Sequence, residues 1–399
     1  MNHPSNRPPR MHRPRPLAPD PDSPLGLVLS GGGARGAFQV GVWKVLLEDP
    51  RGFGGLPLVI SGTSAGALNG ALIAAGLHPD EMLEFWLDLA ARPPVIANEA
   101  FFSTLERALV KILAVEPVRG VRRRIREVSI LSALVRKHRW YKSSGLFALI
   151  LEFVMTARFD SLSALLNSIS TSYLFDTRPV RERLARAIRG THVGNKRVRL
   201  AINTVDIGTG SVVRIVNHRP SKSPRSSARH YRYEPDITLD MIMASASIPI
   251  LFNPVQIDGR YLWDGGLLVN SPMAPAVALG ASRIVPVLVT TRGGNHGDPV
   301  PTFGAAIERL ADAFLENAYN IDRKLLLARN ALAEGTGEPD LRAVELFQAI
   351  RPRSSSVFDA GSYLLFEPEA LKAMYRAGMD AARAWLDRGP GVDSREREE

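Results

Sequence analysis

A glycine-flanked serine near residue 64 is the first group in the sequence that could do covalent chemistry. Gly62, Ser64 and Gly66 form a G-x-S-x-G pattern that follows a β-branched segment and precedes an apolar one. Such a pattern between a strand and a helix predicts a sharp turn that exposes the serine hydroxyl for attack on a carbonyl carbon. The two glycines leave room for the tight backbone and for an arriving ester. A Ser/Gly turn that only caps a helix is the alternative interpretation.

A run of three glycines, Gly31, Gly32 and Gly33, follows the first apolar segment of the chain. Backbone N–H groups without side-chain obstruction could receive the negative oxygen of a tetrahedral intermediate. With Gly36 the run also spells G-x-G-x-x-G, which binds dinucleotides when an acidic residue ends the second strand. The second strand leads into the Ser64 turn without a carboxylate, so an oxyanion loop is favoured over a dinucleotide site. A plain glycine-rich turn is the third interpretation.

A serine nucleophile needs a base, and the sequence offers two candidates. Asp264 precedes Gly265 and Gly266 in a D-G-G pattern. A hydrolase triad in the order Ser, acid, His requires a histidine after the acid, and only His296 follows Asp264. His296 falls in a Gly/Pro-rich loop after an apolar strand, where such a base could lie. On residue order alone, a Ser–Asp–His triad that uses His296 therefore stays open.

Three blocks of sequence together resemble the signature of the patatin-like phospholipases. They are G-G-G-x-R-G at residues 31–36, G-x-S-x-G around Ser64, and D-G-G at Asp264. Other parts similar to the family are the segments 172–179 and 244–255, with Asn270 and Pro272. The order and spacing of the three blocks make this likeness more specific than any block alone.

The resemblance covers about residues 25–90 and 172–292, and extends more weakly to residue 388. It implies an α/β fold and the hydrolysis of lipid acyl esters, of the phospholipase A or lysophospholipase type. It also implies a Ser–Asp dyad in which Asp264 accepts the proton of Ser64 directly, without a cofactor or a metal ion. A catalytically weak lipid-binding or scaffolding protein with the same fold is the alternative, and the intact serine and aspartate argue against it.

Arg35 follows the glycine run and admits two roles. Its guanidinium could neutralise a phosphate or a fatty-acid carboxylate near the loop, since arginine recognises both groups bidentately. It could instead anchor the loop to a neighbouring carboxylate. We favour the anchoring role. Arg35 therefore stands with Gly62, Gly66, Gly265 and Gly266 as a residue that supports the site.

Strand and helix patterns alternate along most of the chain, which predicts an α/β fold with a mostly parallel central sheet flanked by helices. Both glycine loops follow strands, so they should meet at the carboxyl edge of the sheet. The predicted strands lie near residues 25–30, 57–61, 198–205, 211–217 and 283–291. Long helical patterns cover residues 302–334 and 367–387.

Residues 93–171 interrupt this alternation. Strand signals are missing there, and apolar and basic residues recur at helical spacing, which predicts an all-helical insertion or lid. We expect one hydrolase domain over residues 25–388 that includes this insertion. The segments 1–24 and 389–399 are rich in proline, arginine or acidic residues, and we expect both to be disordered tails.

The insertion carries most of the excess positive charge of the chain. Within residues 118–142, nine Lys and Arg face one Glu, a net +8 out of the +10 of the whole chain. An apolar run follows to residue 157, and it is shorter than the roughly 18 residues that a spanning helix needs. A basic helix beside an apolar one is a common design for an anionic membrane surface. A solvated basic face over a buried helix is the alternative; nucleic acid is disfavoured because no aromatic stacking platform accompanies the charge.

Composition narrows the remaining classes. The chain has 399 residues, 45% of them hydrophobic, enough for a large core. The absence of cysteine excludes disulfides and thiolate metal sites, and no H-E-x-x-H spacing suggests a metal centre. The first residues lack the apolar stretch of a secretory signal. We therefore expect a cytoplasmic protein, peripheral to a membrane if the segment 118–157 binds one.

Overall fold

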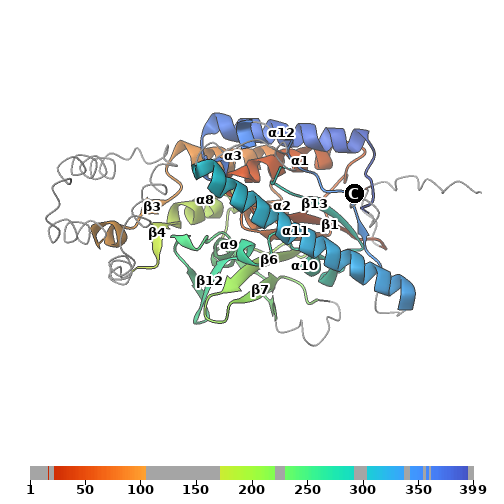
Figure 1. Ribbon diagram of the computed structural model, residues 1–399, viewed down its shortest axis with the longest axis horizontal. Helices are drawn as coiled ribbons and strands as arrows, with labels where there is room; N and C mark the ends of the chain where they lie inside the picture. Colours follow the sequence, from red (N-terminus) through yellow and green to blue (C-terminus); the bar gives the residue numbers. More distant parts are fainter. Residues whose placement is uncertain are drawn as a thin grey trace, which may run out of the picture.

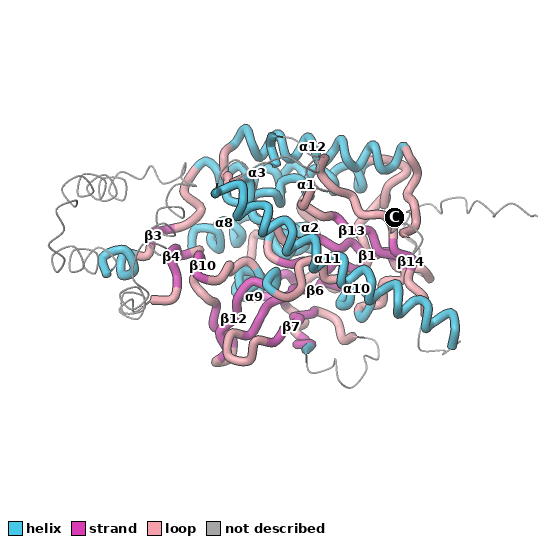
Figure 2. The backbone as a smooth tube through the Cα atoms, viewed as in Figure 1, coloured by secondary structure: helices cyan, strands magenta, loops and turns pink. Residues whose placement is uncertain are grey.

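A nine-stranded mixed sheet forms the centre of the part of the chain that the structure describes, with strand order β11-β12-β6-β2-β1-β13-β14 and with β7 and β8 continuing from β6 (Figures 1 and 2). The structure is a computed structural model. It describes residues 17, 22–104, 171–220, 230–291, 303–336, 342–353, 356–358 and 361–393.

Five neighbouring strands of the sheet run parallel, which confirms the predicted sheet type. They are β1 (Leu25–Leu29), β2 (Val59–Thr63), β6 (Arg199–Asp206), β13 (Arg283–Val287) and β14 (Glu345–Leu346). The antiparallel pairings lie beyond β6, on the side of β7 (Ser211–Val216), β8 (Tyr231–Tyr233), β11 (Val255–Ile257) and β12 (Arg260–Asp264). Every residue of β1 and β2 is buried, because helices cover both faces of a parallel sheet.

Successive strand residues face opposite layers, and each layer has its own apolar core. Leu27, Leu29 and Ile60 belong to the larger core, whereas Val28 and Val59 belong to the smaller one. The larger core includes α1 (Gly36–Glu48), α2 (Ala65–Ala74), α3 (Pro79–Ala91), α8 (Arg178–Ile188), α9 (Leu239–Ser245) and α12 (Pro368–Asp387). The smaller core lies under α10 (Met273–Ala278) and α11 (Phe303–Thr336).

Helices α1 and α12 pack side by side over the sheet and meet at a pair of glycines (Figure 1). A methyl group on Gly41 would contact the carbonyl oxygen of Tyr375, and one on Gly378 would contact that of Phe38. The two helix backbones therefore lie in direct contact at the crossing, where a side chain would not fit. This contact makes α12 a structural part of the domain rather than an appendage.

A small second sheet corrects the prediction of an insertion that is wholly helical. Its strand order is β10-β4-β3, where β3 (Ile96–Ala97) pairs antiparallel with β4 (Tyr173–Asp176) and β10 (Ile250–Phe252) pairs parallel with β4. The two residues of β3 carry no alternating pattern, and tertiary pairing alone makes them a strand. Residues 99–104 are helical, as predicted. The rest of the insertion before residue 171, with its basic segment, lies outside the described residues.

Both predicted tails are partly tied to the domain, which corrects their boundaries. Leu17 is 1% exposed, and the carbonyl oxygen of Pro24 accepts the backbone N–H groups of Ser282 and Arg283. At the other end, the N–H of Asp393 donates to Leu346, and Arg323 forms an ion pair with the Asp393 carboxylate at 2.6 Å. Composition favoured disorder there, but an open edge at β14 offers partners that composition does not reveal.

Candidate active site

Ser64 lies on a strained turn between β2 and α2. Its φ is 55° and its ψ is −124°, and its side chain is largely buried. A non-glycine residue rarely adopts a positive φ, and such strain is common at functional turns. A methyl on Gly62 would contact the carbonyl oxygen of Gly66, and one on Gly66 would contact that of Leu29. Backbone atoms thus require both glycines, as the sequence pattern indicated.

The sheet brings Asp264 beside Ser64. Strand β6 lies between β2 and β12, and its Asn203 and Thr204 pair with Thr63 and Asp264 respectively. Asp264 is 4% exposed at the end of β12. Its carboxylate accepts a hydrogen bond at 2.7 Å from the N–H of Gly266, and the Ser64 side chain lies near enough to lower its pKa as a hydrogen-bond donor. The two residues at the centre of the sequence prediction are therefore neighbours.

Burial controls the charge of the Asp264 carboxylate. Loss of solvent raises its pKa to about 6, and the hydrogen bonds from Ser64 and Gly266 act in the opposite direction. A carboxylate with a raised pKa is a stronger base than an exposed one. At neutral pH the group is ionised and oriented toward a hydroxyl proton.

The glycine run beside Ser64 offers two free N–H groups rather than three. The N–H of Gly31 donates to the side chain of Asn270 at 3.1 Å and to its carbonyl oxygen at 3.2 Å. In the described part of the chain, nothing accepts from the N–H of Gly32 or Gly33. Gly33, the first residue of the short helix η1 (Gly33–Arg35), has a φ of 55°. Of the three predicted donors, Gly32 and Gly33 remain available to a ligand.

Space, rather than backbone conformation, requires glycine at position 32. Its φ of 165° is extended, so any residue could adopt it. A methyl group there would overlap the side chain of Val289, whereas one on Gly33 would contact the carbonyl oxygen of Tyr363. The loop is therefore confined by β13 and its continuation on one side and by the chain before α12 on the other.

Two further residues hold the turn, and the sequence analysis did not single them out. The N–H of Ser64 donates to the hydroxyl of Ser245 at 3.0 Å, and this hydroxyl donates to the carbonyl oxygen of Asn203 at 2.6 Å. The Asn203 side-chain amide in turn donates to Gly62 at 2.9 Å. Ser245 lies within the segment 244–255, whose family likeness was the available signal. The Ser64 N–H is consequently occupied and does not face a substrate.

The fully buried guanidinium of Arg35 is held by contacts with other parts of the protein. It donates to the Ser362 hydroxyl at 2.8 Å and to the Phe358 carbonyl at 2.9 Å, and it forms an ion pair with Asp312 at 2.9 Å. The Tyr363 ring lies 3.8 Å from its central carbon, a cation–π distance. The guanidinium is thus bound to other protein groups, which is what the anchoring role requires.

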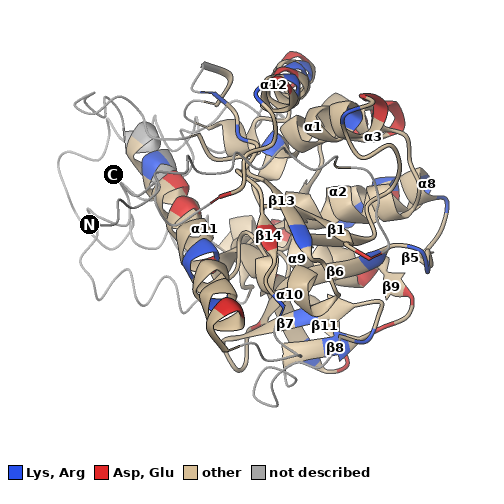
Figure 3. Ribbon diagram, turned by 90° about the vertical axis from the view of Figure 1, so that its right-hand side faces the viewer, with Lys and Arg blue, Asp and Glu red and all other residues tan. Residues whose placement is uncertain are grey.

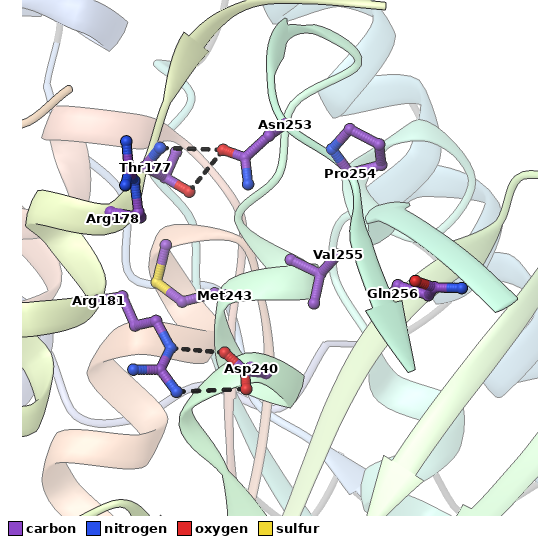
Figure 4. Close-up of a pocket in the computed structure, with 9 residues that line it drawn as sticks. All are labelled: Thr177, Arg178, Arg181, Asp240, Met243, Asn253, Pro254, Val255 and Gln256. Carbon is purple, nitrogen blue, oxygen red and sulfur yellow. Dashed lines mark hydrogen bonds and ion pairs between the residues drawn. The ribbon is translucent and has the colours of Figure 1, made fainter. Parts of the chain in front are cut away.

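A separate hollow of about 280 Å³ lies between α8, α9 and the turn from β10 to β11 (Figure 4). Arg181 and Asp240 form a two-contact ion pair on its wall, at 2.5 and 3.2 Å. Across from them, the side chain of Asn253 accepts from the backbone and hydroxyl of Thr177. None of the predicted site residues lines this hollow, and the polar groups named are already paired with each other.

The described residues contain no group of three or more His, Asp or Glu side chains placed to hold a metal ion. His296, the candidate third member of a triad, lies outside the described residues.

The described residues thus form an α/β protein in which a buried serine and aspartate lie beside each other at the carboxyl edge of the parallel strands, next to a glycine loop. A profile of the family described as patatin-like phospholipase matches residues 27–277. The chain belongs to this family, which confirms the resemblance of its three sequence blocks. Membership supports a lipid acyl hydrolase as its enzyme class.

Individual relatives match over short stretches. Lysophospholipase nte1 of Aspergillus terreus is 59% identical over 51 residues, which are 12% of this chain and 3% of that protein. A patatin-like phospholipase domain-containing protein of Caenorhabditis elegans is 47% identical over 60 residues, or 15% of this chain and 4% of that protein. The matched stretches thus span only a few per cent of these relatives.

Two solved structures are similar at low identity. VipD from Legionella pneumophila is 16% identical with a TM-score of 0.37, over 93% of this chain and 68% of that one. The type III effector protein ExoU is 17% identical with a TM-score of 0.31, over 93% of this chain and 53% of that one.

Proposed function

We propose that this protein is a serine lipid acyl hydrolase that uses Ser64 and Asp264 as a catalytic dyad. The observation that carries the proposal is that β6 places the two buried side chains beside each other, near enough for Ser64 to act on the pKa of Asp264. The Ser64 oxygen attacks the acyl carbonyl carbon while Asp264 takes the hydroxyl proton. The N–H groups of Gly32 and Gly33 stabilise the negative oxygen that forms.

Collapse of this tetrahedral intermediate breaks the ester bond. Asp264 returns the proton to the leaving alcohol, and the acyl group stays on the Ser64 oxygen. Asp264 then accepts a proton from water as the water oxygen attacks the acyl carbon. The bond between the acyl carbon and the Ser64 oxygen breaks, Asp264 returns the proton to that oxygen, and the fatty acid leaves. One base thus serves both half-reactions, and no cofactor enters the scheme.

A lipid ester is the substrate class that we infer, of the phospholipase A or lysophospholipase type. Family membership supports this inference. So do Leu267 and Leu268, which follow the D-G-G pattern and are 39% and 51% exposed. Apolar side chains next to the base offer a contact for an acyl chain that a small polar ester would not use.

Replacing the dyad residues one at a time tests the proposal. Ser64→Ala and Asp264→Asn should each lower hydrolysis of a short p-nitrophenyl ester by several orders of magnitude, because residues that act as a unit give similar losses singly. Ser64→Ala should also lose labelling by a fluorophosphonate probe. Ser211→Ala, on β7, is the matched control and should keep both signals. Turnover close to that of the wild type in Asp264→Asn would exclude this residue as the base, and a wild type that neither labels nor turns over would favour the scaffolding alternative.

The triad that uses His296 makes a different prediction. Under the dyad, His296→Ala should leave turnover within about threefold of the wild type, because a general base usually contributes roughly 100-fold or more. A loss of that size in a folded variant would replace the dyad by the triad.

Membrane contact through residues 118–157 and a single hydrolase domain over residues 25–388 are further parts of the proposal. Among the described helices, none is long and apolar enough to cross a membrane. Each Lys or Arg near an anionic surface contributes about 1 kcal/mol, so binding should depend on lipid charge. Pelleting with anionic vesicles that survives replacement of Arg122, Arg123, Arg124 and Arg126 by Gln would favour the solvated-face alternative.

A further inference from the structure

Helix α11 exposes a stripe of apolar side chains along one face, from Leu310 to Leu332. Leu310, Phe314, Ile321, Leu325 and Leu332 are between 50% and 71% exposed. The helix crosses the front of the molecule in Figure 1 and runs along one margin of its described part in Figure 3. Soluble monomers seldom expose contiguous apolar patches larger than a few hundred Å².

The stripe lies opposite the face that attaches α11 to the domain. At about 100° per residue, the five side chains fall within an arc of about 60°. On the attached face, Asp312 forms an ion pair with Arg35, and Arg323 forms one with Asp393. Tyr319 and Leu326 on the same face belong to the smaller core. Helix α11 is therefore apolar on its outer face as well, which packing on the sheet does not require.

The order of side chains along the stripe is self-complementary about Ile321. Position 310 is as far from residue 321 as position 332 is in the other direction, and positions 314 and 328 are related in the same way. An antiparallel second copy would therefore set Leu310 against Leu332, the large Phe314 against the small Ala328, and Leu325 against Asn317. The largest side chain of the stripe, Phe314, would have room against Ala328, and the two leucines at the ends would contact each other, as in a packed two-fold interface.

We propose that α11 is the interface of a homodimer, in which two copies pair antiparallel with the two-fold axis at Ile321. The stripe from Leu310 to Leu332 is about 33 Å long at about 1.5 Å per residue. Five large side chains, each about half exposed or more, offer on the order of 500 Å² per protomer when a large side chain presents about 150–250 Å². With the flanks of the helix, this area approaches the roughly 800 Å² per partner of a stable interface.

A second copy fits the stripe better than a lipid surface does. A bilayer would accept any apolar order, whereas an antiparallel second copy sets Phe314 against the small Ala328 and Leu310 against Leu332. The nearest charged side chains, Lys324 and Arg329, flank the stripe on opposite sides rather than gathering as a basic patch. Nothing in this pairing involves Ser64 or Asp264, so the proposal stands apart from the proposed function.

The lack of native cysteine allows a direct test of register. Ile321→Cys should cross-link to its own copy through a short bismaleimide in the full-length protein, because a residue on the two-fold axis faces itself. Leu310→Cys alone should not, since its copy would lie about 33 Å away at about 1.5 Å per residue. A mixture of Leu310→Cys and Leu332→Cys should cross-link. Cross-linking of Leu310→Cys to itself, or none with Ile321→Cys, would overturn the antiparallel pairing.

Sedimentation without lipid gives the second readout. The wild type should sediment at twice its 43.6 kDa chain mass, and Ile321→Glu should weaken the dimer at least tenfold because it sets two like charges face to face. Ile96→Glu, at a position that is 48% exposed on β3 and away from α11, is the matched control. Both variants should keep ester hydrolysis and circular dichroism. A wild type that is monomeric at tens of micromolar would overturn the proposal, and loss of vesicle binding in Ile321→Glu would then mark the stripe as a lipid-facing surface.

Discussion

Two glycine turns leave neighbouring parallel strands beside the same serine, and they are confined in different ways. At the elbow after β2, added methyl groups would meet backbone atoms of Gly66 and Leu29. In the loop after β1, a methyl on Gly32 would meet only the side chain of Val289. Backbone in a central sheet cannot yield, whereas a side chain can be shortened. The nucleophile is therefore positioned by the sheet itself, and the proposed oxyanion loop partly by a side chain that can be replaced.

Gly66→Ala should have the largest effect, because it pushes the elbow away from β1. We expect turnover to fall by more than about 100-fold, as for a misplacement of about 1 Å. Stability should fall with it, by about 1–3 kcal/mol or more from overpacking. Ester hydrolysis and urea unfolding measure the two. A variant with normal stability would show that the elbow has more freedom than its backbone contacts indicate.

Gly32→Ala should lower kcat by about 100-fold, as for one lost oxyanion donor, while the free energy of unfolding changes less than in Gly66→Ala. A double variant tests whether Val289 alone confines the loop. Val289→Ala combined with Gly32→Ala removes the overlapping methyl groups and should recover kcat to within about tenfold of the Val289→Ala protein. Absence of any recovery would mean that the loop, like the elbow, is confined by backbone as well.

Ser245→Ala removes the hydroxyl that joins the Ser64 N–H to the Asn203 carbonyl. Two buried groups then lose a partner, which should destabilise the fold by about 1–3 kcal/mol. We expect kcat to fall about tenfold with KM nearly unchanged, because the residue positions the elbow and touches no substrate. A change confined to KM would contradict this positioning role.

Low pH should reduce activity through the carboxylate of Asp264, because the glycine loop contains no titratable group. Since the pKa of Asp264 is raised to about 6, kcat/KM should decline about tenfold per pH unit below that value as the base becomes protonated. A pH–rate profile on a soluble ester measures this decline. A profile that stays flat down to pH 4 would remove Asp264 from the base role.

The raised pKa of Asp264 affects stability in the opposite direction: activity should rise with pH, whereas stability should fall. The folded protein holds the Asp264 proton up to about pH 6, whereas the unfolded chain releases it near the ordinary aspartate pKa of 3.8. Stability therefore falls as pH rises through this window. Asp264→Asn avoids that cost and should gain up to about 3 kcal/mol relative to the wild type at pH 8, before its weaker hydrogen bonds are counted. Urea unfolding at pH 5 and pH 8 compares the two proteins.

Local sequence patterns were enough to predict the strands and helices that surround the site. The predicted strand at 25–30 is β1 within one residue, and the helical pattern at 302–334 is α11 within two. Apolar runs and helical spacing decide such elements by themselves. The glycines at 62 and 66 were equally legible, because a G-x-S-x-G turn has few other uses between a strand and a helix.

Contacts across long sequence separations could not be predicted. Asn270 occupies the Gly31 N–H from 239 positions away, and Ser245 occupies the Ser64 N–H from 181. Neither pairing leaves a local pattern, so the sequence could not tell which glycine donors stay free. Pairing at the edge of β14 likewise overrode a composition typical of a loose tail.

The burial of Arg35 has a consequence for the order in which the protein is made. Ser64 and Asp264 lie in the first 264 residues, but Phe358 and Ser362, which hold Arg35, come 323 and 327 positions after it. Synthesis proceeds from the N-terminal end, and a domain generally folds as a unit. A nascent chain that ends near residue 350 carries the nucleophile and its base, yet lacks the groups that steady the loop beside them. Translation therefore delivers the reactive pair first and its support among the last residues made.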